Sequence, residues 1–346
     1  MRNFSIIVLF FSFTVFTFGQ AGKGVFQFLD LPTSSRLAAL GGNNVSLRDD
    51  DLNFAFQNPA LLTSTTHNIV SLNYASYLAD IMFGSAMYGY NYGENYFSAG
   101  IHYVDYGTFD ATDEVGNIYG TFTAKDFALN LVYARSLNDY FTFGATFKPI
   151  YSVYEHYSSF ALAADLGVHF TDSTKRFSAG LVFRNMGAQL KGFYDNIDGQ
   201  HREPMPFDMV LGGSVKFKHA PIRISLTLNN LHRWNVDYKK TNQPNNTFGK
   251  YADPTKDEIG FVDMAFRHAV FSAEILPSKN MYLAISYNHR RRMEMAMENF
   301  KSVSGFSFGA GIKVYKFHVG FGASQFQLGH MAYQFSISTT LNEFGL

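Results

Sequence analysis

The sequence contains no cysteine among its 346 residues. Disulfide bridges, thiolate metal sites, cysteine nucleophiles and lipoprotein anchor cysteines are therefore excluded. Charged residues make up only 16% of the chain and the formal net charge is +0, so nothing in the composition indicates a nucleic-acid partner. A single Trp accompanies 37 Phe and 21 Tyr, and this aromatic content is typical of strands.

Long hydrophobic runs are missing except at the N-terminus. Arg2 precedes an apolar stretch over residues 6–18, and small residues follow where a signal peptidase would cut. This pattern predicts a signal peptide over residues 1–19 and a mature chain that begins at Gln20. The run is shorter than the roughly 20 residues of a membrane-spanning helix, and the mean hydropathy of -0.08 is too polar for a helical membrane protein.

From His67 onward the sequence alternates apolar residues with small or polar ones. Phe306 and Phe308, for example, alternate with Gly305, Ser307 and Gly309. Successive side chains of a strand point to opposite faces, so each run has one apolar face and one small or polar face. The register places Phe306, Phe308, Phe317, Phe321, Ile222 and Ile224 toward lipid, and Lys313, His318, Arg223 and Lys148 toward the inside of a barrel.

About fourteen such runs follow one another, many of about ten residues or more, which is the length that a tilted strand needs to cross a bilayer. The predicted strands are 67–77, 81–91, 95–106, 119–136, 139–153, 158–171, 175–186, 207–218, 221–230, 265–276, 280–290, 303–315, 316–326 and 331–341. A soluble sandwich would also alternate, but soluble strands average only about 5–6 residues. We therefore predict an all-β fold, a 14-stranded transmembrane antiparallel β-barrel of the bacterial outer membrane.

The connections between the predicted strands differ in length. Every second connection is a tight turn, as at Asn138-Asp139, whereas the other set holds the long ones at 107–118, 187–206, 231–264 and 291–302. Outer-membrane barrels have short periplasmic turns and long outer loops. The barrel should therefore occupy residues 67–346, with both of its ends on the periplasmic side.

Residues 20–66 differ from the rest of the chain and contain two short helical pieces. The first, over 34–40, has Ser34 as a helix N-cap and ends at two glycines, whereas Pro59 prevents one long helix after Asp51. We expect this segment to lie inside the barrel as a short helical plug. At its centre, Asn58 should bond to backbone or lumen groups, Pro59 should end a helix, and Ala60 should follow.

The sequence offers little for catalysis. His156 lies near Ser158 and His201 near Glu203, but there is no Gly-x-Ser-x-Gly nucleophile motif and no His-x-x-x-His metal spacing. We therefore expect no catalytic residues, no metal and no cofactor. An outer-membrane hydrolase remains an alternative.

Two charged clusters have more than one interpretation. Asp49–Asp51 could bind calcium, but the spacing favours a solvated turn in which Asp51 caps the second helix. Arg290–Arg292 could bind lipid phosphates, because guanidinium groups pair bidentately with phosphate. The same arginines could instead form a rim cluster balanced by Glu294 and Glu298.

Several motifs occur in order along the chain. They are Arg36-Leu37-Ala38-Ala39-Leu40-Gly41-Gly42, Asn58-Pro59-Ala60-Leu61-Leu62, Tyr106-Gly107-x-Phe109, Asp113-Glu114-x-Gly116-Asn117, Lys148-Pro149-Ile150-Tyr151-Ser152 and Leu231-His232-Arg233-Trp234-Asn235. Together they resemble the PorV/PorQ family of the Bacteroidetes type IX secretion system, whose barrels are FadL-like. The length of the chain is closer to the shorter, PorQ-type members than to the PorV type.

The resemblance implies a non-enzymatic outer-membrane subunit that anchors a PorZ-like surface protein in an attachment complex with PorU- and PorV-like subunits. It also implies contact with outer-membrane lipid or lipopolysaccharide. Because Trp and Tyr often dominate interfaces, we expect the loop 231–264 with Trp234 and Tyr238 to be the main partner surface, with the loop 187–206 beside it. Arg291 and Arg292 should also contribute to partner binding. The alternatives are a FadL-like transporter of hydrophobic molecules and a PorV-like cargo shuttle.

Overall fold

The computed structural model describes residues 24–78, 81–196, 199–236, 259–295, 303–327 and 330–345. The barrel strands are β1 (Ile69–Ser76), β2 (Met82–Tyr92), β3 (Asn95–Thr112), β4 (Ile118–Ser136), β5 (Phe141–Tyr154), β6 (Tyr157–Thr171), β7 (Phe177–Lys191), β10 (Asp208–Lys216), β11 (Ile222–Leu228), β12 (Ala269–Ser278), β13 (Met281–Asn288), β14 (Phe306–Val314), β15 (Phe317–Gln327) and β16 (His330–Thr340). A separate two-stranded hairpin is formed by β8 (Asp195–Asn196) and β9 (Gly199–Gln200).

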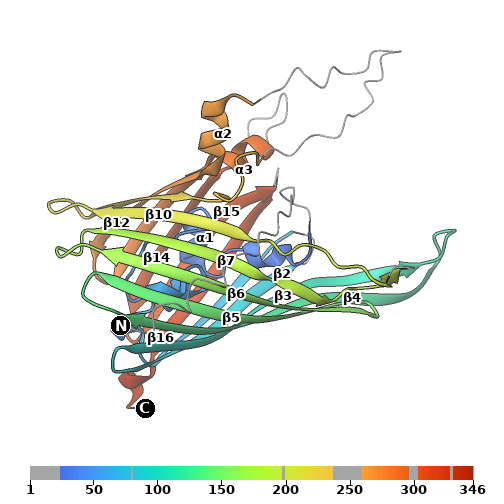
Figure 1. Ribbon diagram of the computed structural model, residues 1–346, viewed down its shortest axis with the longest axis horizontal. Coiled ribbons are helices and arrows are strands. Elements are labelled where there is room, and N and C mark those ends of the chain that lie inside the picture. Colours follow the sequence, from blue (N-terminus) through green and yellow to red (C-terminus); the bar gives the residue numbers. More distant parts are fainter. Residues whose placement is uncertain are drawn as a thin grey trace, which may run out of the picture.

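Within these ranges, fourteen strands close into one antiparallel barrel, which confirms the predicted fold class (Figure 1). Barrel strands that follow one another along the chain are paired in the ring, including β7 with β10. The ring closes where β1 pairs with β16, with Ile69 opposite Thr340. Each of the predicted runs corresponds to one of these strands. The period-two alternation was therefore sufficient to locate the whole wall.

The structure corrects the prediction at four places along the long connections. In the predicted loop 187–206, β7 continues to Lys191 and β8 pairs with β9. Residues 107–118 are not a loop, because β3 and β4 continue as a paired hairpin to Thr112 and from Ile118. The helix α2 (Phe261–His268) occupies the start of the predicted strand 265–276. The helix α3 (His289–Glu294) takes the end of the predicted strand 280–290.

The wall has the predicted two faces. Phe306, Phe308, Phe317, Phe321, Ile222 and Ile224 are all exposed on the outside. Lys148 and Arg223 are buried within the barrel. Lys313 and His318 occupy paired positions on the same inner side near one end, where Lys313 Nζ lies 2.8 Å from Oε1 of Glu343. This apolar outer belt is the surface that outer-membrane barrels present to lipid.

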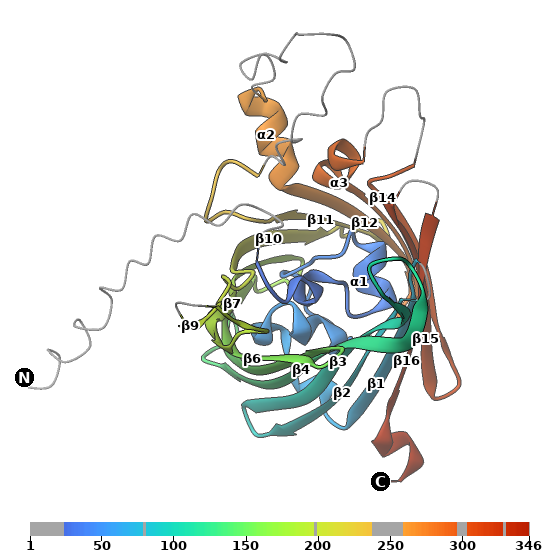
Figure 2. The ribbon, with the colours of Figure 1, turned by 90° about the vertical axis from the view of Figure 1, so that its right-hand side faces the viewer.

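The ring of strands encloses the N-terminal segment, defined here as residues 24–66 (Figure 2). This segment contains η2 (Gln27–Asp30), α1 (Ser35–Ala39), η3 (Leu52–Phe56), η4 (Pro59–Leu61) and η5 (Ser64–Thr66). Ser34, Asp51, Asn58 and Thr63 cap the last four of these elements through side-chain acceptors. Such short helices are marginal alone, so the surrounding wall must hold them.

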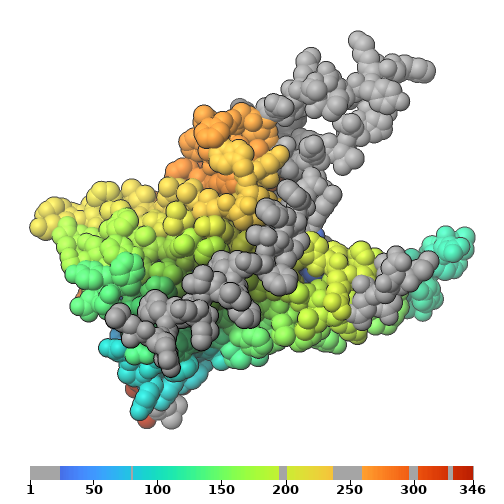
Figure 3. Space-filling model, viewed as in Figure 1, coloured from blue at the N-terminus to red at the C-terminus, as the bar shows by residue number. Residues whose placement is uncertain are grey.

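The two ends of the barrel differ. Short turns such as Tyr315-Lys316, together with the start of β1 and the end of β16, lie at one end, the short-turn end. The long β3–β4 hairpin, α2 and α3 lie at the other, the long-loop end, and project from the body of the barrel (Figure 3). No helix in the described ranges is both long and apolar enough to cross a membrane.

Candidate functional site

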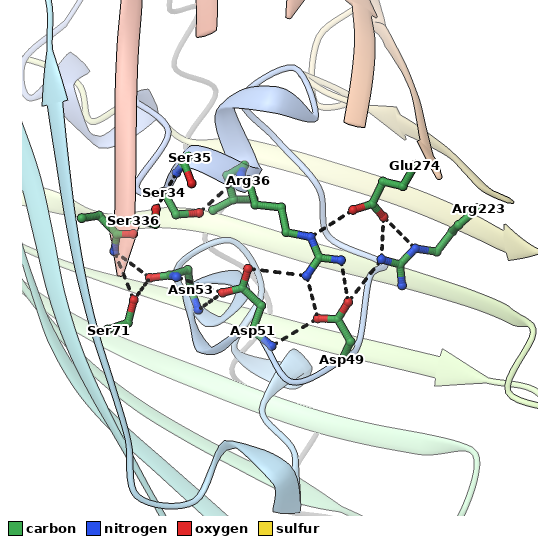
Figure 4. Close-up of polar contacts among 12 residues, drawn as sticks. Ser34, Ser35, Arg36, Asp49, Asp51, Asn53, Ser71, Arg223, Glu274 and Ser336 are labelled. Carbon is green, nitrogen blue, oxygen red and sulfur yellow. Dashed lines mark hydrogen bonds and ion pairs between the residues drawn. The ribbon is translucent and has the colours of Figure 1, made fainter. Parts of the chain in front are cut away.

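A buried ionic network joins the N-terminal segment to the wall around Arg36 of α1 (Figure 4). The Arg36 guanidinium forms a fork on Asp49, with 2.8 Å between Nη2 and Oδ2, and its Nε donates to Oε1 of Glu274 at 2.9 Å. Its Nη1 lies 3.6 Å from Oδ2 of Asp51. One arginine of the segment is therefore fixed by carboxylates from its own loop and from β12.

Arg223 of β11 completes the network from the wall. It donates to Glu274 Oε2 at 2.7 Å through Nε and to Asp49 Oδ2 at 3.2 Å through Nη2. Asp49 and Glu274 thus each bridge two guanidinium groups, and the Glu274 side chain is only 1% exposed. Buried carboxylates are stable as ions only when they are paired in this way.

The prediction of a solvated Asp49–Asp51 turn is wrong for two of the three residues. Burial would raise the pKa of Asp49, but Arg36 and Arg223 hold that pKa well below its usual range. Asp51 caps η3 as predicted, accepting from the Asn53 backbone N–H. Its pKa is raised, because burial and the neighbouring Asp49 outweigh the effect of Arg36. Among the described residues, no group of three His, Cys, Asp or Glu side chains is placed to hold a metal ion.

Asn58 is fully buried at the centre of the N-terminal segment. Its Nδ2 donates to the carbonyl of Val45 at 2.9 Å and more weakly to that of Val168 at 3.4 Å, while its Oδ1 accepts from the Ala60 backbone N–H at 3.0 Å. Pro59 begins η4 rather than ending a helix. Proline suits the first position of a helix because the backbone N–H that it lacks would have no partner within the helix there.

Glycines on the inner face of the wall let the N-terminal segment approach the strand backbone. A Cβ at Gly144 would lie 2.5 Å from the Pro59 carbonyl carbon, and one at Gly167 or Gly180 would overlap Asn58 or Val45. On the opposite wall, a Cβ at Gly309 would lie 2.5 Å from that of Ala39. The glycine-rich faces of the strands therefore match the contacts of the enclosed segment.

Two more ion pairs lie on the inner wall, and of their four residues sequence analysis placed only Lys148 there. Arg184 of β7 lies 3.0 Å from Asp208 of β10 and also donates to Gln57 at 2.6 Å. Lys148 lies 2.6 Å from Asp165, beside an irregular stretch of wall where Asn185 has φ 55°. For both ion pairs, the sequence shows only a charged residue within an alternating run. This pattern does not identify the residue with which it pairs.

The lumen near the long-loop end has an apolar side. Phe26 and Phe28, from the start of the N-terminal segment, are buried against inward-facing residues of the wall. The wall residues of this cluster are Ala75, Phe83, Val104, Ala128, Ile150, Ala161 and Ala163. Phe26 has φ 58°, a conformation that non-glycine residues adopt only when the surroundings compensate. The segment itself therefore fills this apolar space.

A second candidate region is the long-loop platform, defined as Trp234, α2 and α3. Trp234 is 50% exposed and stacks on Phe261 with 4.9 Å between ring centroids. In α2, Phe261 and Val262 are also largely exposed. His289 of α3 lies 2.7 Å from Asp263, which joins the two helices. The platform thus presents aromatic and aliphatic side chains away from the barrel interior.

The three arginines of the cluster Arg290–Arg292 take separate roles, and Arg292, predicted with Arg291 for the partner surface, is half-buried in α3. Arg290 pairs with Glu294 at 2.7 Å, which confirms the balanced rim cluster for that residue. Arg291 reaches inward, with Nη2 3.4 Å from the Gly41 carbonyl oxygen. Tyr238, Glu298 and most of the predicted loop 231–264 lie outside the described residues, as does the signal peptide over 1–19.

The residue pairs weighed for hydrolysis have other partners. Ser158 accepts a hydrogen bond from Lys191 at 2.7 Å, and His156 lies 3.3 Å from Glu155. His201 stacks on Tyr194, and the Glu203 backbone N–H donates to Gln189. The geometry therefore gives neither histidine the role of a base beside a nucleophile.

Comparison with solved structures supports the fold. The toluene transporter TodX of Pseudomonas putida matches with a TM-score of 0.53 at 10% identity, over 89% of this chain and 97% of TodX. A deltaS2 mutant of the TodX monoaromatic hydrocarbon channel matches with a TM-score of 0.53 at 12% identity and the same coverage. A FadL homologue of Pseudomonas aeruginosa has a TM-score of 0.49 at 10% identity, over 89% of this chain and 98% of the homologue.

No protein-family model and no curated protein matches the chain. The similarity to the TodX structures shows a shared β-barrel fold, which in this chain has fourteen strands. At these identities, the likeness extends to the architecture alone.

Proposed function

We propose that this protein is a non-enzymatic outer-membrane docking subunit, of the kind that the PorV/PorQ resemblance implies for type IX secretion. The observation that carries the proposal is the long-loop platform. An exposed, stacked Trp234–Phe261 pair with Val262 beside it has the composition of an interface centre. In the membrane, the long-loop end would face the cell exterior, where a PorZ-like surface protein is available.

The contents of the lumen agree with docking. The N-terminal segment is joined to opposite sides of the wall through Glu274 and through the glycine contacts at Gly144 and Gly167. A segment held in this way acts as a plug, and breaking its buried ion pairs would cost several kcal/mol. A docking subunit needs only its outer surface, so a closed lumen does not impair it.

A second candidate, transport of hydrophobic molecules, has its own supporting observations. The apolar side of the lumen around Phe83 and Ile150 could accept a hydrophobic molecule if Phe26 and Phe28 moved away. The fold likeness to TodX, which is described as a toluene transporter, points the same way. This candidate requires a displacement of the plug, which docking does not.

The variant Trp234→Ala separates the two functions. Truncating an interface hot spot costs about 2 kcal/mol or more, so the surface partner should leave outer membranes that retain normal amounts of barrel. Tyr119→Ala is the matched control, because Tyr119 is an exposed aromatic on the β3–β4 hairpin at the same end. Crosslinking and partner identification from intact membranes would measure retention.

Toluene uptake by the same cells provides the second readout. Docking predicts that Trp234→Ala releases the partner and leaves uptake unchanged. The variant Phe28→Ala should then change neither the retention of the partner nor the uptake of toluene. A change of uptake in the Phe28 variant, with the partner retained in both variants, would reject docking in favour of transport.

A further inference from the structure

An apolar groove of about 360 Å³ lies on the outside of the wall, over β2, β3 and β4, which are side by side in the ring (Figure 2). The side chains that form it are those of Tyr88, Tyr90, Phe97, Ala99, Leu131 and Tyr133. The groove belongs to the outer belt, the surface that a barrel presents to lipid. Neither docking at the platform nor transport through the lumen requires a groove at this place.

Ala99 creates the recess in this groove. Cross-strand pairing places Ala99 of β3 between Tyr88 of β2 and Leu131 of β4. Side chains directly opposite on neighbouring strands are only about 4.5–5.5 Å apart, so one methyl group between two large side chains leaves a hollow over the strand. Hydrocarbon is what fills such a hollow in a bilayer, because acyl chains are the solvent there.

The aromatic rings that wall the groove are fixed by the barrel itself. The Tyr88 hydroxyl donates to Oδ1 of Asn68 at 2.7 Å. The Tyr133 hydroxyl donates to Oδ1 of Asn95 at 2.8 Å, and the Tyr133 ring packs on Phe97 with 5.3 Å between ring centroids. Tyrosines at a membrane interface place the ring in hydrocarbon and the hydroxyl toward the headgroups. These bonds therefore mark the level at which the headgroups begin, and they hold the groove open without a ligand.

A cation lies at the polar end of the groove. One row further toward the short-turn end, pairing aligns Tyr92, Asn95 and Arg135. Arg135 is exposed and shares the outward face with Tyr133 two residues earlier. Its side chain makes no hydrogen bond or ion pair with the residues that the structure describes. A free guanidinium just beyond a row of interfacial aromatic rings lies at the level of lipid phosphates.

We propose that this groove binds one anionic diacyl glycerophospholipid from the leaflet at the short-turn end, with an acyl chain against Ala99 and the phosphate on Arg135. Guanidinium groups pair bidentately with phosphate. From the bilayer core to the short-turn end, the three rows present an apolar recess, aromatic rings and a cation, which is the order of chain, glycerol region and phosphate in a lipid. A second copy of the chain would bring apolar side chains to the groove but no phosphate for Arg135.

The test uses the full barrel in neutral detergent, with native mass spectrometry to count the lipids bound as phosphatidylglycerol or phosphatidylcholine is titrated. One phosphatidylglycerol should bind first, and phosphatidylcholine should bind more weakly. Arg135→Gln should weaken phosphatidylglycerol binding by about tenfold or more, as expected for losing a charged hydrogen bond. Arg176→Gln is the matched control, because Arg176 is an exposed arginine in the turn before β7 at the same end, and it should leave binding unchanged.

Ala99→Phe tests the recess separately from the charge. A phenyl ring there would fill the hollow, so binding of both lipids should fall severalfold. The matched control is Ala310→Phe, because Ala310 is also aligned between two large side chains of the outer face, Leu283 and Phe321, on a different part of the wall. Both alanines face outward, and urea midpoints in phosphatidylcholine vesicles would verify that each variant folds as the unaltered barrel does.

Equal phosphatidylglycerol binding by the two arginine variants would overturn the proposal, as would equal lipid binding by the two alanine variants. Inorganic phosphate should not displace the lipid at concentrations where the lipid saturates the barrel. Displacement there would assign Arg135 to a free anion instead. A dimer mass in lipid-free detergent that Ala99→Phe dissociates would assign the groove to a second copy of the chain and would also overturn the proposal.

Discussion

Arg36 and Arg290 both pair with a carboxylate at less than 3 Å, yet the two pairs differ in what surrounds them. Arg36 lies inside the barrel and meets Glu274, whose side chain is 1% exposed. Arg290 lies on the long-loop platform and meets Glu294, one helical turn away, with side chains 26% and 35% exposed. A surface pair of this kind contributes little, whereas breaking a buried network leaves an uncompensated charge. The same chemistry therefore holds the N-terminal segment firmly and the platform weakly.

The largest expected effect comes from Glu274→Gln. This change leaves Arg36 and Arg223 short of one negative charge in the interior, and losing one partner of a buried pair costs about 3–5 kcal/mol. The urea midpoint of barrels folded in vesicles should fall accordingly. Glu155→Gln, which alters an exposed glutamate next to His156, should leave the midpoint unchanged. Equal midpoints for the two variants would contradict the comparison.

Acid should weaken the interior through Asp49. The folded-state pKa of Asp49 lies below its unfolded value, so its contribution is present above a pH of about 4 and is lost as the pH falls through the folded-state pKa. Asp49→Asn should lower stability at pH 7, and its difference from the unaltered protein should shrink steadily as the pH falls below about 4. Urea midpoints as a function of pH would show this. A difference in urea midpoint that does not change with pH would show that Asp49 does not act through this ionic network.

A smaller effect is expected at the centre of the N-terminal segment. Asn58→Leu leaves the Val45 carbonyl without its donor and removes the cap of η4, and an unpaired buried polar group costs about 1–3 kcal/mol. Limited proteolysis of residues 24–66 should become faster, and single-channel conductance should rise. Asn280→Leu, in the exposed β12–β13 turn, serves as the control. Unaltered protection of the segment would show that Asn58 does not hold it.

The smallest effect is expected on the platform. Glu294→Gln removes an exposed pair one helical turn apart, which contributes about 0.3–0.5 kcal/mol. Its urea midpoint should therefore be nearly that of the unaltered barrel. A shift as large as that of Glu274→Gln would mean that α3 is more deeply integrated than its exposure indicates.

The wall was predictable because lipid and lumen impose opposite demands on alternate residues. Phe306 and Phe308 had to face outward once Ser307 and Lys313 faced inward. The prediction of strand boundaries failed where the contrast between lipid on one face and lumen on the other is absent. Beyond the membrane, both faces of the β3–β4 hairpin meet water, so the alternation that defines a strand is lost near Phe109 and Phe122, which stack there.

The interior was predictable only in part. A charge such as Arg223 within an alternating run indicated a polar lumen, and Asn58 was expected to bond to backbone or lumen groups, as it does to the Val45 carbonyl. The partner of Arg36 could not be found, because Glu274 lies 238 positions away and only barrel closure brings them together. The helices α2 and α3 were missed because each is short and joins a strand directly.

The seam between β1 and β16 has a consequence for assembly. It joins the first and last strands of the ring, with Ile69 opposite Thr340, so its hydrogen bonds have the longest loop to close and should form late. The N-terminal segment contacts walls from β5, through Gly144, to β14, through Gly309. A finished cylinder would offer it no sideways entry. If this seam closes last, the strands wrap around a segment that is already in position, and residues 24–66 then act as a template for the barrel that encloses them.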